Sequence, residues 1–558
     1  GTSPLDLAPR RFGRVVACDG GLIEVSGLGV PIGTLCSIAQ GASTEHRAET
    51  IGFRNGHTMM MMLGDTVLLR PGAIVRPEGN PGMLSVGEQY LGRAVDGAGE
   101  PIDGRGPVMA TTSWPAGGHR VGALDRSRVT QVFDSGIRSL NALTTFGVGQ
   151  RVGIVAGSGV GKSVLMDMIV DGADADAVVV GLIGERAREV GDFVAKVMTG
   201  ENRAKTCVVA VPADRSPLLR LRAAHRATAI AEYFRDQGKQ VMLIMDSLTR
   251  VAHARREIGL ALGEQPTAKG YTPSVISMIP GLIERAGHGL PGQGSITAFY
   301  TILADGDDTT NDPVVDTARA ILDGHFVLSR NQAQMGIYPA IDLTQSVSRV
   351  MKDIAEKPHH AAALRLRRLI ALYMENRDMM LMGAYSPGQD ATLDEAVALW
   401  PRIENFIRQD IHEPASLEDS ISARQHRLLT LMARQENREL GHLSMQLGHL
   451  RQQEMQQFDM ADRLGQMLDQ SAQAPAEPMT PGQLSTAHFM GRTLVQQLEA
   501  TRSQMARTRQ ERAAVEQDLS QHQRRQQILQ ERADLSRRAL HVARAEAEDN
   551  ATLPRRTR

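Results

Sequence analysis

The sequence predicts an α/β protein in which a small β-barrel precedes a parallel-sheet domain, a helical domain and a two-helix rod. Short strand-like runs between glycine-rich turns come first, strands alternating with helices follow, and helices without strands fill the rest. Such alternation is typical of a parallel sheet with helices on both faces. The expected parts are the barrel at 1–85, the sheet domain at 86–345, the helical domain at 346–433 and the rod at 434–558.

Length and composition favour about three ordinary domains, since a domain usually has about 100–200 residues. The chain has 558 residues, 42% hydrophobic and 22% charged, a balance that allows a sizeable core. Its 62 basic and 63 acidic residues nearly cancel, so no charge excess indicates a nucleic-acid partner. The three cysteines are far apart, which excludes a disulfide framework and favours a reducing compartment, the cytoplasm. No apolar run approaches the about 18 residues of a transmembrane helix, and residues 1–10 show no secretory signal.

Residues 11–85 predict the barrel. Short apolar runs alternate there with glycine-rich turns at a regular spacing, which is typical of small barrels. The run Met59–Met62 could suggest a metal site, but a barrel strand explains it without any ligand. The expected strands include Arg14–Cys18, Leu22–Val25, Thr34–Ile38 and Thr66–Leu69.

The composition changes after residue 433. Phe458 and Phe489 are the only aromatic residues beyond it, and glutamine becomes frequent. Apolar residues recur at helical spacing over two stretches, about 422–470 and 484–548, on either side of the Pro/Ala-rich segment Ser471–Gly482. The spacing predicts a helical hairpin with an imperfect coiled-coil seam. Sixty-five helical residues span roughly 95–100 Å, so this part is expected to be a rod.

The strongest functional pattern is a glycine-rich segment between the strand-like run Val152–Val155 and a helical run that starts at Val164. Glycines let backbone N–H groups wrap phosphate oxygens, and the new helix points its positive N-terminus at them. Lys162 would reach the β and γ phosphates, and the Ser163 hydroxyl would bind Mg²⁺. A chance glycine-rich turn is the alternative, but the order of strand, loop and helix argues against it. The segment consists of Ala156, Gly157, Ser158, Gly159, Val160, Gly161, Lys162 and Ser163.

Two further strand-like runs end in carboxylates. The run Val241–Met245 leads to Asp246, about 80 residues after the phosphate loop, and a carboxylate at that edge of a sheet can bind the Mg²⁺ of a nucleotide. Glu185 follows the run Val178–Ile183 and could orient the water that attacks a phosphate. A charged loop can also be simply solvated, so the residue types alone leave the role of Glu185 open.

These three elements, in this order, resemble the rotary-type hexameric ATPases related to the catalytic β subunit of F-type ATP synthase. Further segments resemble the type III export ATPases, and the flagellar export ATPase is the closest fit. The resemblance covers about residues 11–433. The segments that carry it are Leu91–Gly97, Ser216–Arg222, Arg255–Ala261, Gly294–Tyr300 and Ile321–His325.

The resemblance implies a β-barrel, a RecA-like nucleotide domain and a helical domain that assemble as a hexameric ring using ATP and Mg²⁺. It also implies partners: a stator-like regulatory protein, a membrane protein of the export gate, and export substrates with their chaperones. The ring would lie at the inner face of the cytoplasmic membrane. The implied roles are Lys162, Ser163 and Asp246 for phosphate and Mg²⁺, Glu185 as catalytic carboxylate, Arg186 as its neighbour, Tyr338 and Tyr385 for adenine, and Arg349 as arginine finger.

The sequence departs from the family pattern at several places. The phosphate loop begins with Ala156, and Ala187 stands where glycine is expected. Only about ten residues precede the barrel, which puts binding of the regulatory partner in doubt. Residues 434–558 resemble, in pattern only, the two-helix stalk protein of export systems; a generic oligomerising rod is the alternative. Six such rods cannot all occupy one pore, so the oligomeric state stays open.

The sequence patterns allow several functional hypotheses. The leading hypothesis is ATP hydrolysis that energises flagellar export, and an injectisome ATPase is the alternative. A non-catalytic ring subunit that binds nucleotide is a second class, but the acidic Glu185 favours catalysis. A nucleic-acid translocase is disfavoured, because the barrel lacks interleaved basic and aromatic residues.

Overall fold

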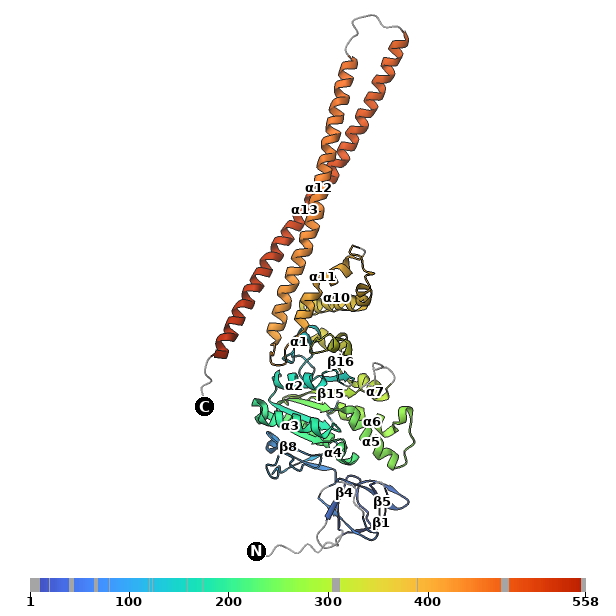
Figure 1. The fold of residues 1–558 in the computed structure, drawn as a ribbon, viewed down its shortest axis with the longest axis vertical. Coiled ribbons are helices and arrows are strands. Elements are labelled where there is room, and N and C mark those ends of the chain that lie inside the picture. Colours follow the sequence, from blue (N-terminus) through green and yellow to red (C-terminus); the bar gives the residue numbers. More distant parts are fainter. Residues whose placement is uncertain are drawn as a thin grey trace. The chain divides into compact units, whose positions relative to one another are not determined.

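The computed structural model describes residues 11–19, 21–39, 45–64, 69–79, 81–119, 121–122, 124–157, 159–172, 174–303, 312–388, 390–472 and 481–552. The chain divides into two compact units, Gly1–Ser420 and Ile421–Arg558, and each is described by itself (Figure 1). The predicted strand Thr66–Leu69 falls almost entirely outside the described residues, as do Ser158 and most of the predicted linker Ser471–Gly482. No helix in the described ranges is long and apolar enough to cross a membrane.

The N-terminal part of the first unit is a closed six-stranded barrel, as predicted. Met59–Met62 lies in one of its strands, and all four side chains are buried, which confirms the strand interpretation of this run. The hairpin between β4 (Glu45–Arg54) and β5 (His57–Met62) turns at Asn55 and Gly56. Both residues have positive φ (50° and 78°), the conformation that a tight two-residue hairpin requires. The strand order is β1 (Gly13–Asp19), β2 (Leu22–Ser26), β5 (His57–Met62), β4 (Glu45–Arg54), β3 (Leu35–Ala39) and β6 (Ile74–Glu78).

A nine-stranded, mostly parallel sheet forms the centre of the first unit. In this sheet only β14 (Gly287–His288) and β17 (Ile341–Ser348) run antiparallel to their neighbours. β15 lies between β10 and β13, although it is the farthest of the three along the chain. The order is β17 (Ile341–Ser348), β16 (Gly324–Leu328), β10 (Arg151–Ala156), β15 (Ser295–Leu303), β13 (Gln240–Asp246), β11 (Ala177–Ile183), β12 (Thr206–Val211) and β8 (Ala94–Val95), with β14 (Gly287–His288) beside β15.

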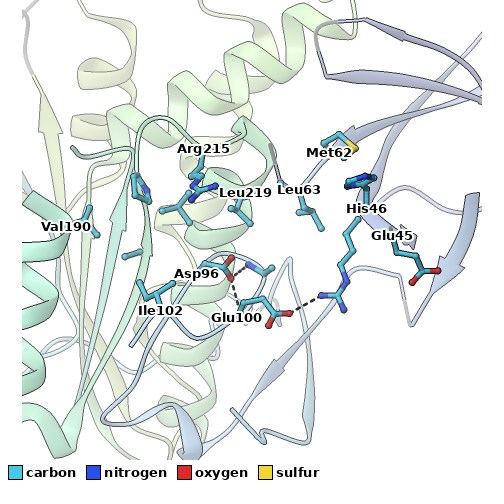
Figure 2. A pocket seen from close by; sticks show the side chains of 16 residues that line it. Glu45, His46, Met62, Leu63, Asp96, Glu100, Ile102, Val190, Arg215 and Leu219 are labelled. Atoms are coloured by element: carbon cyan, nitrogen blue, oxygen red, sulfur yellow. Dashed lines mark hydrogen bonds and ion pairs between the residues drawn. The ribbon is translucent and has the colours of Figure 1, made fainter. Parts of the chain in front are cut away.

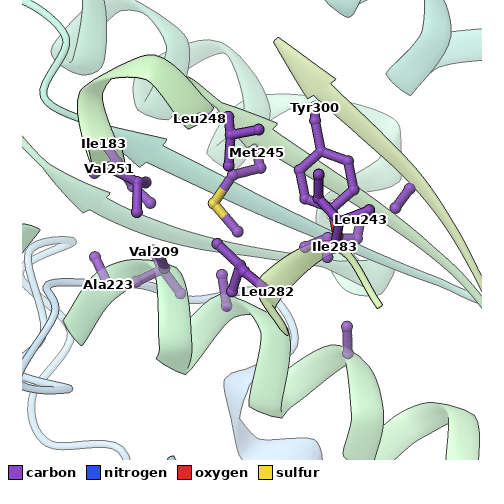
Figure 3. Packing of buried hydrophobic residues seen from close by; sticks show 14 of the residues in the cluster. Ile183, Val209, Ala223, Leu243, Met245, Leu248, Val251, Leu282, Ile283 and Tyr300 are labelled. Atoms are coloured by element: carbon purple, nitrogen blue, oxygen red, sulfur yellow. The ribbon is translucent and has the colours of Figure 1, made fainter. Parts of the chain in front are cut away.

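Helices cover this sheet and bury its central strands on both faces, as the continuous apolar runs of the sequence require. All seven residues of β11 are buried. In the core, Leu243 and Met245 of β13 pack with Leu248 and Val251, which begin the next helix (Figure 3). The helices are α1 (Arg138–Leu143), α2 (Lys162–Gly172), α3 (Ala187–Thr199), α4 (Pro217–Asp236), α5 (Leu248–Ala261), α6 (Pro273–Ile283), α7 (Pro313–Ile321), α8 (Arg330–Gln334) and α9 (Met351–Ile354).

The local sequence explains where the long helices of this domain begin. Ser216 caps α4, accepting a hydrogen bond from the Leu219 N–H, and Pro217 occupies the first turn, where a missing N–H has no cost. Ser247 caps α5 in the same way through the Arg250 N–H. Because Ser247 directly follows Asp246, this cap fixes the end of β13 to the start of a helix.

A helical part follows the sheet, built from α10 (Lys357–Leu381) and α11 (Ala391–Ile407). The rings of Tyr373 and Trp400 stack across the two helices at 3.8 Å. Buried Gln409, just after α11, donates to the Gly136 carbonyl (2.7 Å) and accepts from the Arg138 N–H (2.8 Å). One amide side chain therefore bonds the helical part to the loop that precedes α1.

The second unit is built from the long helices α12 (Leu417–Ala472) and α13 (Pro481–Thr552). They run antiparallel, because ion pairs join Arg451 to Glu516 (3.2 Å) and Glu454 to Arg509 (2.7 Å) and Arg512 (2.9 Å). Their described buried side chains include Leu447, Leu464, Leu498, Met505 and Val515. The two predicted helices are thus present, and a regular coiled coil stays a prediction.

A buried ion pair joins α4 to Arg285, just after α6, and is also bonded to Trp114 of β9 (Thr112–Pro115). Glu232 is fully buried, receives both Nε and Nη2 of Arg285 at 2.8 Å, and accepts the Trp114 indole N–H at 2.9 Å. Removing one partner of a buried pair strands the other charge and costs about 3–5 kcal/mol. We expect Glu232→Gln to lower the free energy of unfolding by about that amount.

Denaturant titration followed by tryptophan fluorescence measures this loss. The control is Glu404→Gln, which breaks the exposed pair with Arg408 and should cost less than about 1 kcal/mol. Equal shifts of the two unfolding midpoints would contradict the assignment.

Candidate active site

The phosphate loop joins the carboxyl end of β10 to the start of α2. Gly159 and Gly161 have φ of 76° and 91°, which residues with a Cβ rarely adopt, so the loop needs glycine at these positions. Ala156 is the last residue of β10 and is buried, so a methyl group is accommodated where the family pattern has glycine. Ser158 lies outside the described residues. The remaining loop residues are Gly157 and Val160, followed by Lys162, Ser163 and Val164 in the first turn of α2.

The side chains of Lys162, Asp246 and Glu185 meet at the carboxyl edge of the sheet. The Lys162 ammonium donates to Asp246 Oδ1 at 2.6 Å and to Glu185 Oε1 at 3.4 Å. Asp246 ends β13, Glu185 follows β11, and Lys162 begins α2 after the loop that leaves β10. All three side chains are largely buried. This edge is where ligands bind in open α/β sheets, so the structure brings the three predicted groups into one site.

A cavity of about 260 Å³ opens beside these groups. Ser163, Glu185 and Asp246 line it together with acidic residues of α2 and α3 and Lys196. The described residues hold no cluster of three or more His, Cys, Asp or Glu side chains suited to a metal ion. One hydroxyl and one carboxylate fit Mg²⁺, which usually takes one or two protein ligands and completes its shell with substrate phosphates and water.

Glu185 lies in an environment that disfavours its charge. Burial raises the pKa of its carboxyl, and the nearby Asp246 raises it further, while Lys162 and Arg250 lower it. The net effect is a raised pKa, which brings a carboxylate closer to the range of an effective general base. This shift and its place in a cavity support the predicted catalytic role.

The other predicted residues are placed as follows. The Tyr338 ring packs beside the phosphate loop, since a Cβ on Gly161 would lie 3.4 Å from it, and the residue is 39% exposed. Arg186 is exposed, 3.5 Å from Glu189. Arg349 is exposed just after β17 and donates to the Arg319 carbonyl at 3.0 Å. These positions are compatible with the predicted roles, which stay predictions.

Tyr385 lies in the turn between α10 and α11. Its hydroxyl donates to Asp394 in the first turn of α11. This contact ties Tyr385 to the helical part, and the described contacts provide no link between it and Tyr338 or the phosphate loop. A role of Tyr385 in binding adenine therefore stays a prediction from the resemblance.

Three polar residues of the site were not found by sequence reasoning. Arg250 of α5 packs against Gly184, and its Nε is buried without a partner among the described residues. The Thr301 hydroxyl of β15 donates to Asp246 at 2.5 Å. The guanidinium of Arg330, which begins α8, lies 3.5 Å from the place of a Cβ on Gly157. No local pattern marks these residues, since the order of the strands and the helices that follow them bring these side chains to the site.

A second cavity, of about 680 Å³, lies between the barrel and the sheet (Figure 2). The end of β12 forms one wall with Val211, and Val190 of α3 lines both cavities. The Glu185 loop is bonded to this wall: the Gly184 N–H donates to the Val211 carbonyl (2.8 Å) and the Ala213 N–H to the Glu185 carbonyl (3.0 Å). The wall therefore fixes the backbone that carries Glu185.

Two parts of the chain match known protein families. Residues 136–348 match the ATP synthase alpha/beta family, nucleotide-binding domain, and residues 355–425 match the T3SS EscN ATPase C-terminal domain. The flagellum-specific ATP synthase of Salmonella typhimurium is 46% identical over 426 residues, 75% of this chain and 93% of that protein. The type 3 secretion system ATPase of Xanthomonas euvesicatoria is 43% identical over 413 residues, 74% of this chain and 93% of that protein.

Solved structures agree with the sequence matches. The assembled ATPase EscN of the enteropathogenic E. coli type III secretion system is 39% identical, with a TM-score of 0.69 over 74% of this chain and 98% of that one. The structure of assembled EscN with its central stalk EscO gives a TM-score of 0.67 at 38% identity. Fold and site together define a nucleotide-hydrolysing ATPase of the ATP synthase α/β class. The chain belongs to the family of flagellum-specific ATP synthases and type III secretion ATPases.

The raised pKa of Glu185 predicts how activity depends on pH. In its predicted role Glu185 acts as a base only when ionised, so we expect kcat/KM to fall as the pH drops through its pKa, with a midpoint above the value of about 4.3 for an ordinary glutamate. Arg250 lowers this pKa, so Arg250→Met should move the midpoint to higher pH. Initial ATPase rates against pH measure the shift, with the exposed Arg408→Met as control. A midpoint that stays fixed or moves down in Arg250→Met contradicts the electrostatic assignment.

Proposed function

We propose that the chain is the ATPase of a flagellar type III export system and hydrolyses Mg-ATP in an oligomeric ring. The meeting of Lys162, Asp246 and Glu185 at one sheet edge carries the proposal. The flagellar assignment rests on relatives of that name at up to 46% identity. The type 3 secretion ATPase at 43% keeps an injectisome as the alternative.

The residues of the chain divide the chemistry among them. The backbone N–H groups of the phosphate loop and the N-terminus of α2 bind the phosphates, and Lys162 leaves Asp246 to neutralise the β and γ oxygens. Ser163 and Asp246 would hold Mg²⁺, which supplies charge neutralisation on the same oxygens when bound. Glu185 orients and polarises the attacking water. A bare nucleotide-binding subunit would not need this carboxylate, so Glu185 favours catalysis over a non-catalytic role.

Arg349 completes the site from a second copy of the chain in this proposal. It is exposed, and its guanidinium contacts only the Arg319 carbonyl among the described hydrogen bonds, so it is available to a neighbour. A cation supplied in trans stabilises charge in the transition state and is worth about 10³–10⁵ in rate. Activity then depends on assembly, and the assembled form of EscN supports a ring, proposed here as a hexamer.

A mixing experiment tests the trans assignment. Glu185→Gln and Arg349→Ala subunits should each be inactive alone, because each lacks one half of every site. In a ring that contains both, one kind of interface joins an intact Glu185 to an intact Arg349. Equal mixing should therefore restore roughly a quarter of the wild-type activity, since heterologous interfaces pair the subunits at random.

ATPase rates of the mixture against each variant alone give the answer, and a Glu185→Gln/Arg349→Ala double variant mixed with wild type is the control for dilution. No recovery in a mixture that assembles normally would place Arg349 in its own subunit's site, and Arg349→Ala subunits that are active alone would place it outside the chemistry.

The surroundings of the ring are proposed from the family. We expect a location in the cytoplasm at the inner face of the membrane, a stator-like regulatory partner, the export gate membrane protein, and export substrates with chaperones. No nucleic-acid partner is proposed. One similar structure contains EscN with its central stalk EscO, and residues 434–558 lie beyond the matched family domains. We propose that this helical hairpin acts as a stalk joined to its own ATPase.

Truncation after Ala433 tests the role of the hairpin. The ATPase part should fold, because its core lies in the first unit. Ring assembly, and with it ATP hydrolysis per subunit, or export in cells should drop several-fold. Light scattering and secreted flagellin measure the two effects. A hairpin with shuffled apolar and polar positions is the control for chain length. Unchanged assembly together with unchanged export would refute a stalk-like or oligomerising role.

A further inference from the structure

Asp246 is held by two donors that bind the same oxygen. Its Oδ1 accepts the Lys162 ammonium at 2.6 Å and the Thr301 hydroxyl at 2.5 Å. Asp246 is 3% exposed and Thr301 is fully buried. Oδ2 has no hydrogen bond within the described part of the chain, so it is the oxygen left to face a ligand in the cavity that Asp246 lines.

The sheet explains why a threonine reaches this carboxylate. β15 pairs with β13 on one side, with Tyr300 opposite Met245, and with β10 on the other, with Thr301 opposite Ile154. Thr301 therefore lies at the level of Asp246, between β13, which ends in Asp246, and β10, which leads into the phosphate loop. A β-branched side chain in a strand has few accessible χ1 rotamers, so this hydroxyl is a stiff donor.

The two donors differ in what they do when nucleotide enters. The ammonium of Lys162 is needed by the phosphates and has to leave Asp246. Thr301 has no second task, since its hydroxyl lies in the core beneath the cavity and its only other described acceptor is the Met245 carbonyl at 3.5 Å. After Lys162 turns away, Thr301 alone fixes the plane of the carboxylate.

We propose that Thr301 is a positioning residue that orients Asp246 for Mg²⁺ through the hydrogen bond to Oδ1. The inference rests on the proposed Mg-ATP function and deepens it by naming the residue that orients the Mg²⁺ ligand Asp246. Groups that orient metal ligands typically contribute 10–100-fold to metal affinity. Thr301 acts through Asp246 and is not itself placed on the substrate.

Binding in the absence of turnover tests the proposal. All variants are made in full-length Glu185→Gln chain, and the affinity for ATP is measured by calorimetry with Mg²⁺ and again with excess EDTA. Thr301→Val keeps shape and removes the hydroxyl, so the gain in affinity that Mg²⁺ provides should shrink roughly 10-fold or more. Affinity in EDTA should stay within about twofold, and Thr301→Ser should restore the gain.

Thr297→Val is the matched control. Thr297 is also a buried threonine of β15, four residues away on the same face, but its hydroxyl accepts from the Gly149 N–H at 2.9 Å and does not contact Asp246. Its variant should lower the melting temperature without changing the Mg²⁺ gain. An unchanged gain in Thr301→Val, or an equal loss in Thr297→Val, overturns the proposal. A Glu185→Gln parent that binds ATP equally well with and without Mg²⁺ overturns the proposed function as well.

Discussion

The position of β15 between β10 and β13 is the constraint on which the active site depends. These strands carry the phosphate loop, Thr301 and Asp246, and their parallel pairing brings all three to one edge of the sheet. Their register is fixed by packing on both buried faces, because a slip by one residue would turn every side chain to the opposite face and disrupt the close packing there. The site is therefore as rigid as the core beneath it, and only the loops above it are free to respond to nucleotide.

Electrostatics then sets the state of this site before nucleotide arrives. Two carboxylates, Glu185 and Asp246, share one ammonium in a largely buried place. Unpaired charges there would be costly, and Lys162 offsets one of the two carboxylate charges. In the proposed mechanism a phosphate group competes for the same ammonium, and its negative charge adds to that of the two carboxylates. The proposed use of Mg²⁺ is consistent with this excess of negative charge in the pocket.

Local patterns predicted the parts of the site that depend on neighbouring residues in sequence. The phosphate loop needs glycine at positions with positive φ, and Asp246 and Glu185 stand at or just after the ends of apolar runs, so each has a recognisable sequence pattern. Thr301 and Arg250 have no such pattern, because their positions depend on the order of the strands and on the cap that starts α5. The barrel and the parallel sheet were predicted from alternation, whereas the place of β15, 139 residues after the start of the phosphate loop at Ala156, depends on packing of the whole sheet.

Gln409 connects the helical part to the nucleotide-binding domain through hydrogen bonds. Its side chain bonds the loop before α1, and its backbone N–H donates to the Tyr338 carbonyl at 2.8 Å. Tyr338 in turn packs on the phosphate loop at Gly161. Because Gln409 is buried, a movement of the helical part either carries Tyr338 with it or leaves polar groups of Gln409 unpaired at a cost of about 1–3 kcal/mol each. A movement of the helical part is thereby coupled to Tyr338 and, through its packing at Gly161, to the phosphate loop.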